Sequence, residues 1–290
     1  MAERRPSGRA ARGNGRGPAV VLAVGGLDPS GGAGVLADAR AIALAGAWPA
    51  AVCASLTVQS TRGLVAVQAV ARAFVAAQLD ELFADLPIDV VKTGALGSAA
   101  NARLLAALAR ARPELRLVVD PVLGATRARG GAATLNVASG RALEALCAAA
   151  ALVTPNVPEA ERLLGAPIGD AAGAERAARA LARRWGTAVL LKGGHLPGRG
   201  PVRDFLAAGG AVTALAHPRH RTPPLHGTGC TLAALVAGRL ATRGPRGRAT
   251  LDEWARLVRW AQGRMDRLLG APLTLGRGLS VLGPRLAPRA

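Results

Sequence analysis

Short apolar runs with the length of buried strands alternate along this chain with segments of helical periodicity. The strand-like runs cover residues 19–24, 51–58, 88–91, 115–120, 152–153 and 188–191. The helical segments cover about residues 34–45, 73–84, 99–111, 141–150, 157–164, 174–185, 232–237 and 251–269. Uninterrupted apolar runs are typical of parallel strands covered on both faces. The alternation therefore predicts an α/β fold with a mostly parallel central sheet and helices on both faces.

The length and the residue types indicate how this fold is divided. With 290 residues, half of them hydrophobic, the chain can bury the core of one large domain, which we expect over residues 19–275. Residues 1–18 are rich in arginine and glycine and are expected to be a disordered basic tail, and residues 276–290 a C-terminal tail. Without a membrane-spanning run or a secretory signal core, the protein is expected to be cytoplasmic. Its three cysteines are too scattered for a disulfide framework or a clustered metal site.

Charge is unevenly distributed between the two basic residue types. The formal net charge is +19, but the excess is mostly arginine spread along helices and tails, and no tyrosine is present for base stacking. We therefore expect neither nucleic acid nor a membrane as a partner. The only lysines are Lys92 and Lys192, and each follows an apolar strand-like run. They either mark places where a compact ammonium is needed or are surface lysines retained by chance.

Residues 225–231 form a glycine-bearing loop that leads into an apolar helical run. Gly227 and Gly229 allow a tight turn with exposed amides, and the helix adds its partial positive end, so the loop can hold an anion. Cys230 stands at the start of this helix, where the pKa of a thiol is expected to be lowered. The alternative is an ordinary turn with a small buried cysteine.

Several polar residues follow the predicted strands. The loop after the first strand carries Asp28, and Asp38 lies on the helix that follows. Gln59 and Asp120 stand at strand ends, where ligands contact open α/β sheets. Gln59 can bond the edge of a heterocycle, and Asp120 can hold a metal through water. The alternatives are a turn for Gln59, a loop cap for Asp120, a turn or helix cap for Asp28, and a solvated helix face for Asp38.

Asn156 and Glu159 lie three residues apart at a helix start and are expected to point the same way. They either face a ligand or form an N-cap with a first-turn acid. Residues 124–134, with two arginines and paired glycines, are expected to form a loop that closes over a phosphorylated substrate.

Six motifs together resemble a known family. In chain order they are Asp28-Pro29-Ser30-Gly31-Gly32-Ala33-Gly34 with Asp38, residues 56–63, Asp120-Pro121-Val122, residues 154–160, Lys192-Gly193-Gly194-His195 and residues 226–231. Their types and order are similar to those of the hydroxymethylpyrimidine/phosphomethylpyrimidine kinases of thiamine synthesis, which have a three-layer ribokinase-like fold. The resemblance extends from about residue 19 to residue 269.

The resemblance implies ATP-dependent phosphorylation of 4-amino-5-hydroxymethyl-2-methylpyrimidine and then of its monophosphate, with magnesium. Cys230 is implied as the base, and the amides of Gly227, Thr228, Gly229 and Cys230 as the anion hole. Asn156, Glu159, Lys192 and Thr228 are implied as ATP or phosphate contacts, with Asp120 and Glu159 holding magnesium through water. Pyrimidine contacts are implied for Asp38 and Gln59, beside Gly26, Ala33, Ala95 and Val122. A homodimer is also implied.

The chain departs from this family at the substrate pocket. Ala95 and Leu123 stand where methionines are usual, Gly26-Leu27 replaces a small polar pair, and Leu225 replaces a threonine. These changes affect the pyrimidine pocket rather than the phosphate-binding residues. Two alternatives therefore stay open: a pyridoxal-type kinase of the same fold, and a non-catalytic pyrimidine-binding protein.

Overall fold

The computed structural model describes residues 17–124, 140–244 and 247–283. Of the predicted N-terminal tail only residues 17 and 18 fall within these ranges. Of the predicted closing loop, residues 124–134, only Gly124 does. The arginines of that loop, Arg127 and Arg129, lie outside the described residues.

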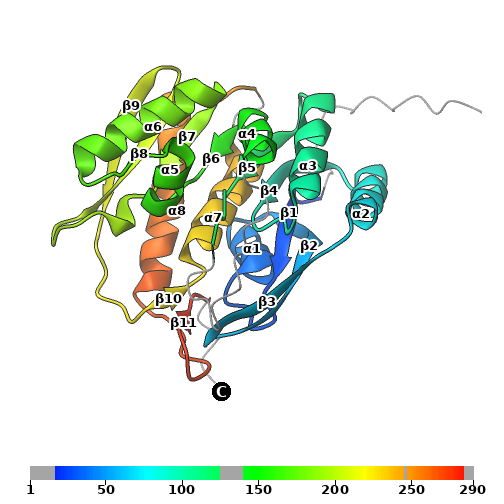
Figure 1. The fold of residues 1–290 in the computed structure, drawn as a ribbon, viewed down its shortest axis with the longest axis horizontal. Helices are drawn as coiled ribbons and strands as arrows, with labels where there is room; N and C mark the ends of the chain where they lie inside the picture. The colour runs from blue at the N-terminus through cyan, green and yellow to red at the C-terminus, as the bar shows by residue number, and fades with distance from the viewer. Residues whose placement is uncertain (1–16, 125–139, 245–246, 284–290) are drawn as a thin grey trace, which may run out of the picture.

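A nine-stranded sheet forms the centre of the molecule, in the order β3-β2-β1-β4-β5-β6-β7-β8-β9 (Figure 1). The strands are β1 Val20–Leu27, β2 Trp48–Ser60, β3 Gly63–Ala69, β4 Ile88–Thr93, β5 Arg116–Val119, β6 Leu152–Val153, β7 Ala188–Leu191, β8 Val202–Ala208 and β9 Ala211–His217. Six strands run parallel to one another: β2, β1, β4, β5, β6 and β7. The other three, β3, β8 and β9, pair with their neighbours antiparallel. The predicted mostly parallel sheet is confirmed.

Helices cover both faces of this sheet, so the fold has three layers, as predicted (Figure 1). One face carries α2 Arg72–Asp85, α3 Ala99–Ala111, α4 Arg141–Ala148, α5 Val157–Leu164 and α6 Ala171–Trp185. The other carries α1 Gly34–Leu44, α7 Thr228–Arg243 and α8 Leu251–Leu269. The parallel strands present apolar side chains to both layers, which explains why they read as uninterrupted apolar runs. No helix in the described ranges is long and apolar enough to cross a membrane.

The first strand is longer than its apolar run suggests. β1 continues through Gly25 and Gly26 to Leu27, where a loop was expected. A side chain at Gly26 would approach the Ser55 hydroxyl on β2 to 2.9 Å. Glycine suits this strand position because a side chain would crowd the Ser55 hydroxyl, and the local pattern of residues could not reveal this contact.

The segment after α8 returns to the centre of the molecule. Ser280–Val281 forms β11, which pairs in parallel with β10, Leu225–His226. The Leu279 amide also donates to the Thr61 carbonyl in the turn after β2, at 2.7 Å. The sequence analysis assigned residues 276–290 to a C-terminal tail, but Val281 and Leu282 are buried. The segment thus links the β2–β3 turn to the loop that begins α7.

Candidate active site

The carboxyl ends of the parallel strands border a cavity of about 430 Å³, called here the first cavity. Its lining includes every residue that the sequence assigned to a site: Gly26, Ala33, Asp38, Gln59, Ala95, Asp120, Val122, Asn156, Glu159, Lys192, Gly227, Thr228, Gly229 and Cys230. Residues from eight separate parts of the chain thus meet at one place, where α/β sheets bind ligands. Their individual roles stay predictions.

The loop from Leu225 to Cys230 forms one wall of this cavity. Gly227 has a φ of +82°, and a side chain there would collide with the Gly32 carbonyl, so only glycine fits. Helix α7 begins at Thr228, and its first intrahelical bond runs from the Thr231 amide to the Gly227 carbonyl at 3.0 Å. The amides of residues 228–230 come before that bond and have no intrahelical acceptor. The predicted loop and helix start are confirmed.

Cys230 differs from the expectation based on its position. A helix start lowers the pKa of an exposed thiol, but burial here raises the pKa of Cys230 to about 12. The Lys92 ammonium opposes this rise, whereas the Asp120 and Asp38 carboxylates add to it. The predicted lowering of its pKa is therefore wrong, because the thiol is desolvated and lies near the Asp120 and Asp38 carboxylates. Cys230 is a thiol at neutral pH.

Lys92 and Asp38 form an ion pair inside the protein, beside the cavity. The Lys92 Nζ atom lies 2.8 Å from both Asp38 oxygens, and the side chains are 0% and 1% exposed. Burial alone would lower the pKa of Lys92, but the Asp38 carboxylate outweighs this and raises it. Burial raises the pKa of Asp38 to about 6, although the Lys92 ammonium opposes this rise. At neutral pH both groups are charged. Asp38 is thus no solvated helix residue, and any contact that it makes with a pyrimidine is made with Lys92 already bound.

The second lysine is also paired with an aspartate. The Lys192 Nζ atom lies 2.9 Å from Asp120 Oδ1, which also accepts from the Thr154 hydroxyl at 3.1 Å. Burial opposes ionisation of Asp120, but Lys192 and Lys92 hold the pKa of its carboxyl below the usual value. Lys92 is fully buried and the Lys192 side chain is 12% exposed, so neither is a surface lysine retained by chance.

Asn156 and Glu159 form the capping box of α5. The Glu159 amide donates to Asn156 Oδ1, and the Asn156 amide donates to Glu159 Oε2, both at 2.8 Å. Burial raises the pKa of Glu159 to about 7, although Lys192 lowers it. The N-cap interpretation is confirmed, and both residues also line the first cavity. No group of three or more candidate metal ligands occurs among the described residues.

Asp28, His226 and Gln59 join the loop after β1 to strands β10 and β2 at the cavity wall. Asp28 accepts hydrogen bonds from the Ser30 and Ala33 amides at 2.9 Å, as the turn interpretation predicted. The His226 Nε2 atom lies 2.9 Å from Asp28 Oδ2 and 2.8 Å from the Gln59 amide nitrogen. If the His226 Nε2–H group donates a hydrogen bond to Asp28, the same nitrogen cannot accept one from the Gln59 amide nitrogen. The side-chain oxygen of Gln59, not its nitrogen, therefore belongs next to His226 Nε2. Sequence reasoning did not predict this contact.

A second cavity of about 280 Å³ lies on the other side of the α7 start. It shares with the first cavity Asn156, Lys192, His195, Thr228 and Gly229. Its own lining combines apolar side chains with polar ones: Val202, Asp204, His217, Pro218, Arg219, His220, Thr222, Leu232, Gln262, Met265 and Leu269. The sequence analysis missed this cavity, although the polar residues that follow β9 were a signal for it.

Two histidine–carboxylate pairs stand in the second cavity. His217 Nε2 lies 3.3 Å from Asp204 Oδ2, and His220 Nε2 lies 3.1 Å from Asp266 Oδ1. Asp204 also accepts from the Gly193 amide and from the Gln262 amide group, at 2.9 and 2.8 Å. Burial lowers the pKa of His217, but the bond to Asp204 outweighs this and raises it. Its charge therefore persists to a higher pH than that of an ordinary histidine.

Comparison with known proteins identifies the relatives of this chain. Residues 28–253 match the model of a family described as phosphomethylpyrimidine kinase. The thiamine biosynthesis bifunctional protein ThiED of Geobacter sulfurreducens is 45% identical over 226 residues, which cover 78% of this chain and 45% of that protein. The hydroxymethylpyrimidine/phosphomethylpyrimidine kinase of Rhizobium meliloti is 39% identical over 226 residues, 77% of this chain and 83% of that protein. The chain thus spans less than half of the first relative and most of the second.

The fold has solved counterparts. The ADP complex of Bacillus subtilis pyridoxal kinase superimposes with a TM-score of 0.78 at 22% identity, over 92% of this chain and 97% of that one. At this identity the likeness concerns the fold, which is the ribokinase-like α/β fold expected from the sequence. The family match covers all six motifs that meet in the first cavity. The chain belongs to the phosphomethylpyrimidine kinase family.

Proposed function

We propose that this protein transfers the γ-phosphoryl group of ATP to 4-amino-5-hydroxymethyl-2-methylpyrimidine and then to the monophosphate that this produces. One observation carries the proposal. Two cavities of unequal character meet at the start of α7. Lys192 lines both, and so do Thr228 and Gly229, whose amides precede the first intrahelical bond. Such an arrangement suits a transfer in which the donor enters from one side and the acceptor from the other.

The nucleotide would occupy the second cavity. Its apolar residues, which include Val202, Leu232 and Met265, suit a purine ring, and its polar residues suit a ribose. The phosphates would then extend toward Asn156, Lys192 and Thr228, which line both cavities. This direction brings the γ-phosphate to the helix start, where amides and the helix dipole favour an anion.

The pyrimidine would occupy the first cavity, between Gln59, Ala95 and Val122. Glycines at residues 25 and 26 leave room there for a flat ring, and Gln59 offers an amide to its edge. The hydroxymethyl group would point toward Cys230. Asp38 would act mainly through Lys92, because Lys92 bonds both of its oxygens.

The first transfer then follows simple steps. The alcohol oxygen attacks the γ-phosphorus of ATP, the bond from this phosphorus to the bridging oxygen breaks, and ADP leaves. The alcohol proton goes to the Cys230 thiolate, and the amides of residues 227–230 hold the charge on the transferred group. Because Cys230 is a thiol at neutral pH, it must first lose its own proton. The Lys92 charge favours that loss.

The residues near the phosphates fit a magnesium ion that is shared with substrate. Mg²⁺ keeps several waters and takes one or two carboxylates together with phosphate oxygens. Asp120 and Glu159 supply two carboxylates beside Lys192, and the described residues contain no larger ligand group. These two residues would hold the ion through water. When bound, the ion would neutralise charge on the phosphates.

Product analysis tests this proposal directly. Purified protein is incubated with the pyrimidine alcohol, ATP and magnesium, and the products are separated and weighed by mass spectrometry. The expected result is the monophosphate followed by the diphosphate, with one ADP formed for each transfer. A folded preparation that binds the pyrimidine but forms no ADP would instead support the non-catalytic alternative.

Pyridoxal is the second candidate acceptor, because a pyridoxal kinase shares 92% coverage and a TM-score of 0.78 with this chain. The sequence relatives favour the pyrimidine instead, at 39–45% identity. Turnover measured with both alcohols under the same conditions separates the two. Turnover of pyridoxal alone would overturn the pyrimidine assignment.

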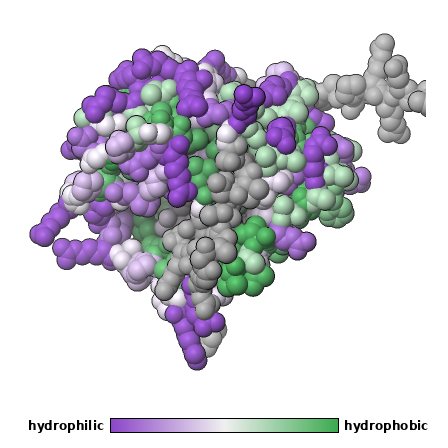
Figure 2. Space-filling model, viewed as in Figure 1, coloured by the Kyte–Doolittle hydropathy of each residue, from purple (hydrophilic) through white to green (hydrophobic). Residues whose placement is uncertain are grey.

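The implied homodimer has a suitable surface on the outer face of β2 and β3. Leu56, Val58 and Val65 are 45%, 61% and 48% exposed, and Figure 2 shows apolar surface over this part of the molecule. An antiparallel sheet edge of this kind can be covered by a second copy. Light scattering of the purified chain would give twice the mass of one chain if the dimer forms.

A further inference from the structure

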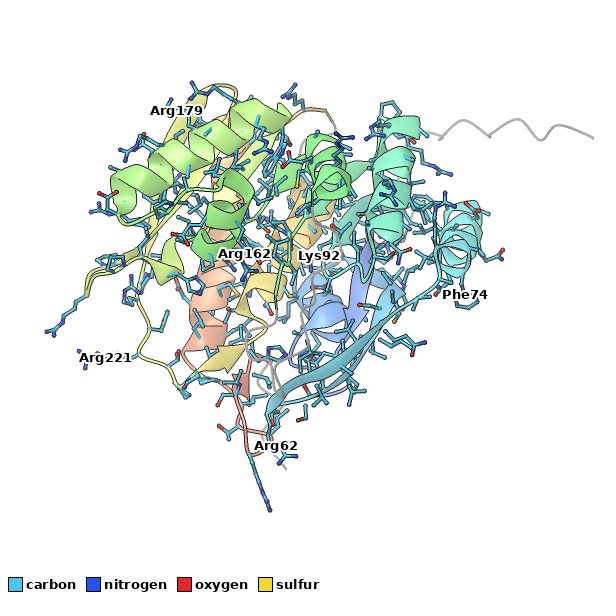
Figure 3. The ribbon with its side chains drawn as sticks, in the orientation of Figure 1. Arg62, Phe74, Lys92, Arg162, Arg179 and Arg221 are labelled. Atoms are coloured by element: carbon cyan, nitrogen blue, oxygen red, sulfur yellow. The ribbon has the colours of Figure 1, made fainter. Side chains whose placement is uncertain are left out.

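Arg162 is a charged residue of the first cavity that the proposed chemistry does not use. It lies on α5, one turn after Glu159, so that both side chains share a helix face. Its Nη1 atom donates to the Leu123 carbonyl at 3.4 Å, and the residue is otherwise exposed. Figure 3 labels Arg162 on α5 and Lys92 on the sheet, on two sides of the central region.

Among the described residues Arg162 has no carboxylate partner, and in this it differs from the two lysines of this cavity. Lys92 is bound to Asp38 at 2.8 Å, and Lys192 to Asp120 at 2.9 Å. The two acids nearest Arg162 in sequence are engaged elsewhere: Glu159 accepts from the Asn156 amide and Glu161 from the Ile168 amide. Among the described residues that line this cavity, Arg162 is thus the guanidinium left to bind an anion.

The position of Arg162 indicates which anion it would bind. It lines the first cavity, where the acceptor would lie, and is absent from the lining of the second. A guanidinium presents a planar fork of donors that matches a phosphate and remains charged at all relevant pH values. The start of α5, whose partial charge is positive, faces the same cavity. These features suit a phosphate on the acceptor, not on the nucleotide.

We propose that Arg162 binds the phosphate of the monophosphate acceptor and so favours the second transfer, an inference that rests on the proposed function. In that transfer an acceptor phosphate oxygen forms a bond to the γ-phosphorus of ATP. The bond from this phosphorus to the bridging oxygen breaks, and its electron pair leaves with ADP. The acceptor phosphate is largely a dianion at neutral pH, so no base needs to remove a proton.

The charge of the acceptor explains why one residue can separate the two transfers. In the second transfer two anions must approach each other, and a neighbouring guanidinium reduces their repulsion. In the first transfer the acceptor is an uncharged alcohol, which gains little from Arg162. Arg162 therefore determines specificity and takes no part in moving a proton.

The test compares both acceptors in variants of Arg162. Steady-state rates are measured at saturating ATP and magnesium for the wild type, Arg162→Ala and Arg162→Lys, with the products separated. In Arg162→Ala the ratio of kcat/KM for the monophosphate to that for the alcohol should fall about tenfold or more, mainly through KM. Arg162→Lys should recover part of this ratio. Arg103→Ala, on the exposed face of α3, is the matched control and should leave the ratio unchanged.

Two results would overturn the inference. In the first, Arg162→Ala lowers kcat/KM equally for both acceptors, which would mean that the residue acts on ATP or on the fold. In the second, Arg162→Ala leaves kcat/KM unchanged for both acceptors, which would mean that Arg162 does not bind the acceptor phosphate. Failure of the wild type to phosphorylate the alcohol would refute the proposed function instead. In that case calorimetric binding of the monophosphate to wild type and Arg162→Ala still decides the role of Arg162, because equal affinities contradict it.

Discussion

The two cavities hold their charges in different ways. In the first, the Lys92 and Asp38 side chains are 0% and 1% exposed, and those of Lys192 and Asp120 are 12% and 3% exposed. In the second, histidine–carboxylate pairs are more open: His217 is 18% exposed and His220 is 24% exposed. The two lysines, whose pKa values are raised, stay charged at neutral pH, whereas an ordinary histidine changes its charge near neutral pH.

This difference matches the tasks proposed for the two cavities. Phosphoryl transfer depends on charges that are held in position before the reaction begins. A nucleotide site must admit and release its ligand, and a partly exposed lining with weaker pairs allows this. We therefore expect changes in the first cavity to affect chemistry or stability strongly, and changes in the second to have smaller, pH-dependent effects.

The largest effect is expected from Cys230→Ala. Loss of the base should lower kcat with the alcohol by about 10²–10⁴-fold, while KM for ATP changes little. The monophosphate should be affected less, because its oxygens are already ionised. Since the pKa of Cys230 is raised to about 12, wild-type kcat with the alcohol should increase with pH above neutrality. A stopped assay with both acceptors at several pH values measures this, and an unchanged kcat would remove Cys230 from the chemistry.

The next effect is expected from Lys92→Met. This change leaves the Asp38 carboxyl buried without its partner and should lower the free energy of unfolding by about 3–5 kcal/mol. The double variant Lys92→Met, Asp38→Asn removes the unpaired charge and should recover part of the loss. Urea unfolding of the wild type and both variants measures these changes in the free energy of unfolding. Equal losses in the single and double variants would mean that the ion pair does not explain the cost.

The smallest effect is expected from His217→Asn in the second cavity. Because Asp204 raises the pKa of His217, its pair stabilises the fold below the ordinary histidine pKa, and this contribution is lost as pH rises through the raised pKa. The variant should therefore lose no more than about 1 kcal/mol at pH 6 and almost nothing at pH 9. Thermal unfolding at both pH values measures it. A larger loss at pH 9 would contradict this account.

Local sequence predicted much of the fold. The helices over residues 99–111 and 251–269 were predicted with their observed bounds, because their periodicity and flanking residues are local signals. The end of β1 was not predicted, because Gly25 and Gly26 belong to a strand only through their pairing with β2. The pairing of β10 with β11 was not predicted either, since it joins segments more than fifty residues apart.

In the candidate site, too, some features could be predicted from the sequence and others depend on contacts between distant segments. The residue types and their order determined the family, the α/β class and the set of motif residues that meet in the first cavity, because motifs at strand ends meet when parallel strands align. Only the tertiary structure decided the charges: that Asp38 holds Lys92, that burial raises the pKa of Cys230, and that Arg162 has no carboxylate partner within the described part of the chain. A pKa and an ion pair depend on burial and on distant neighbours, which local sequence does not contain.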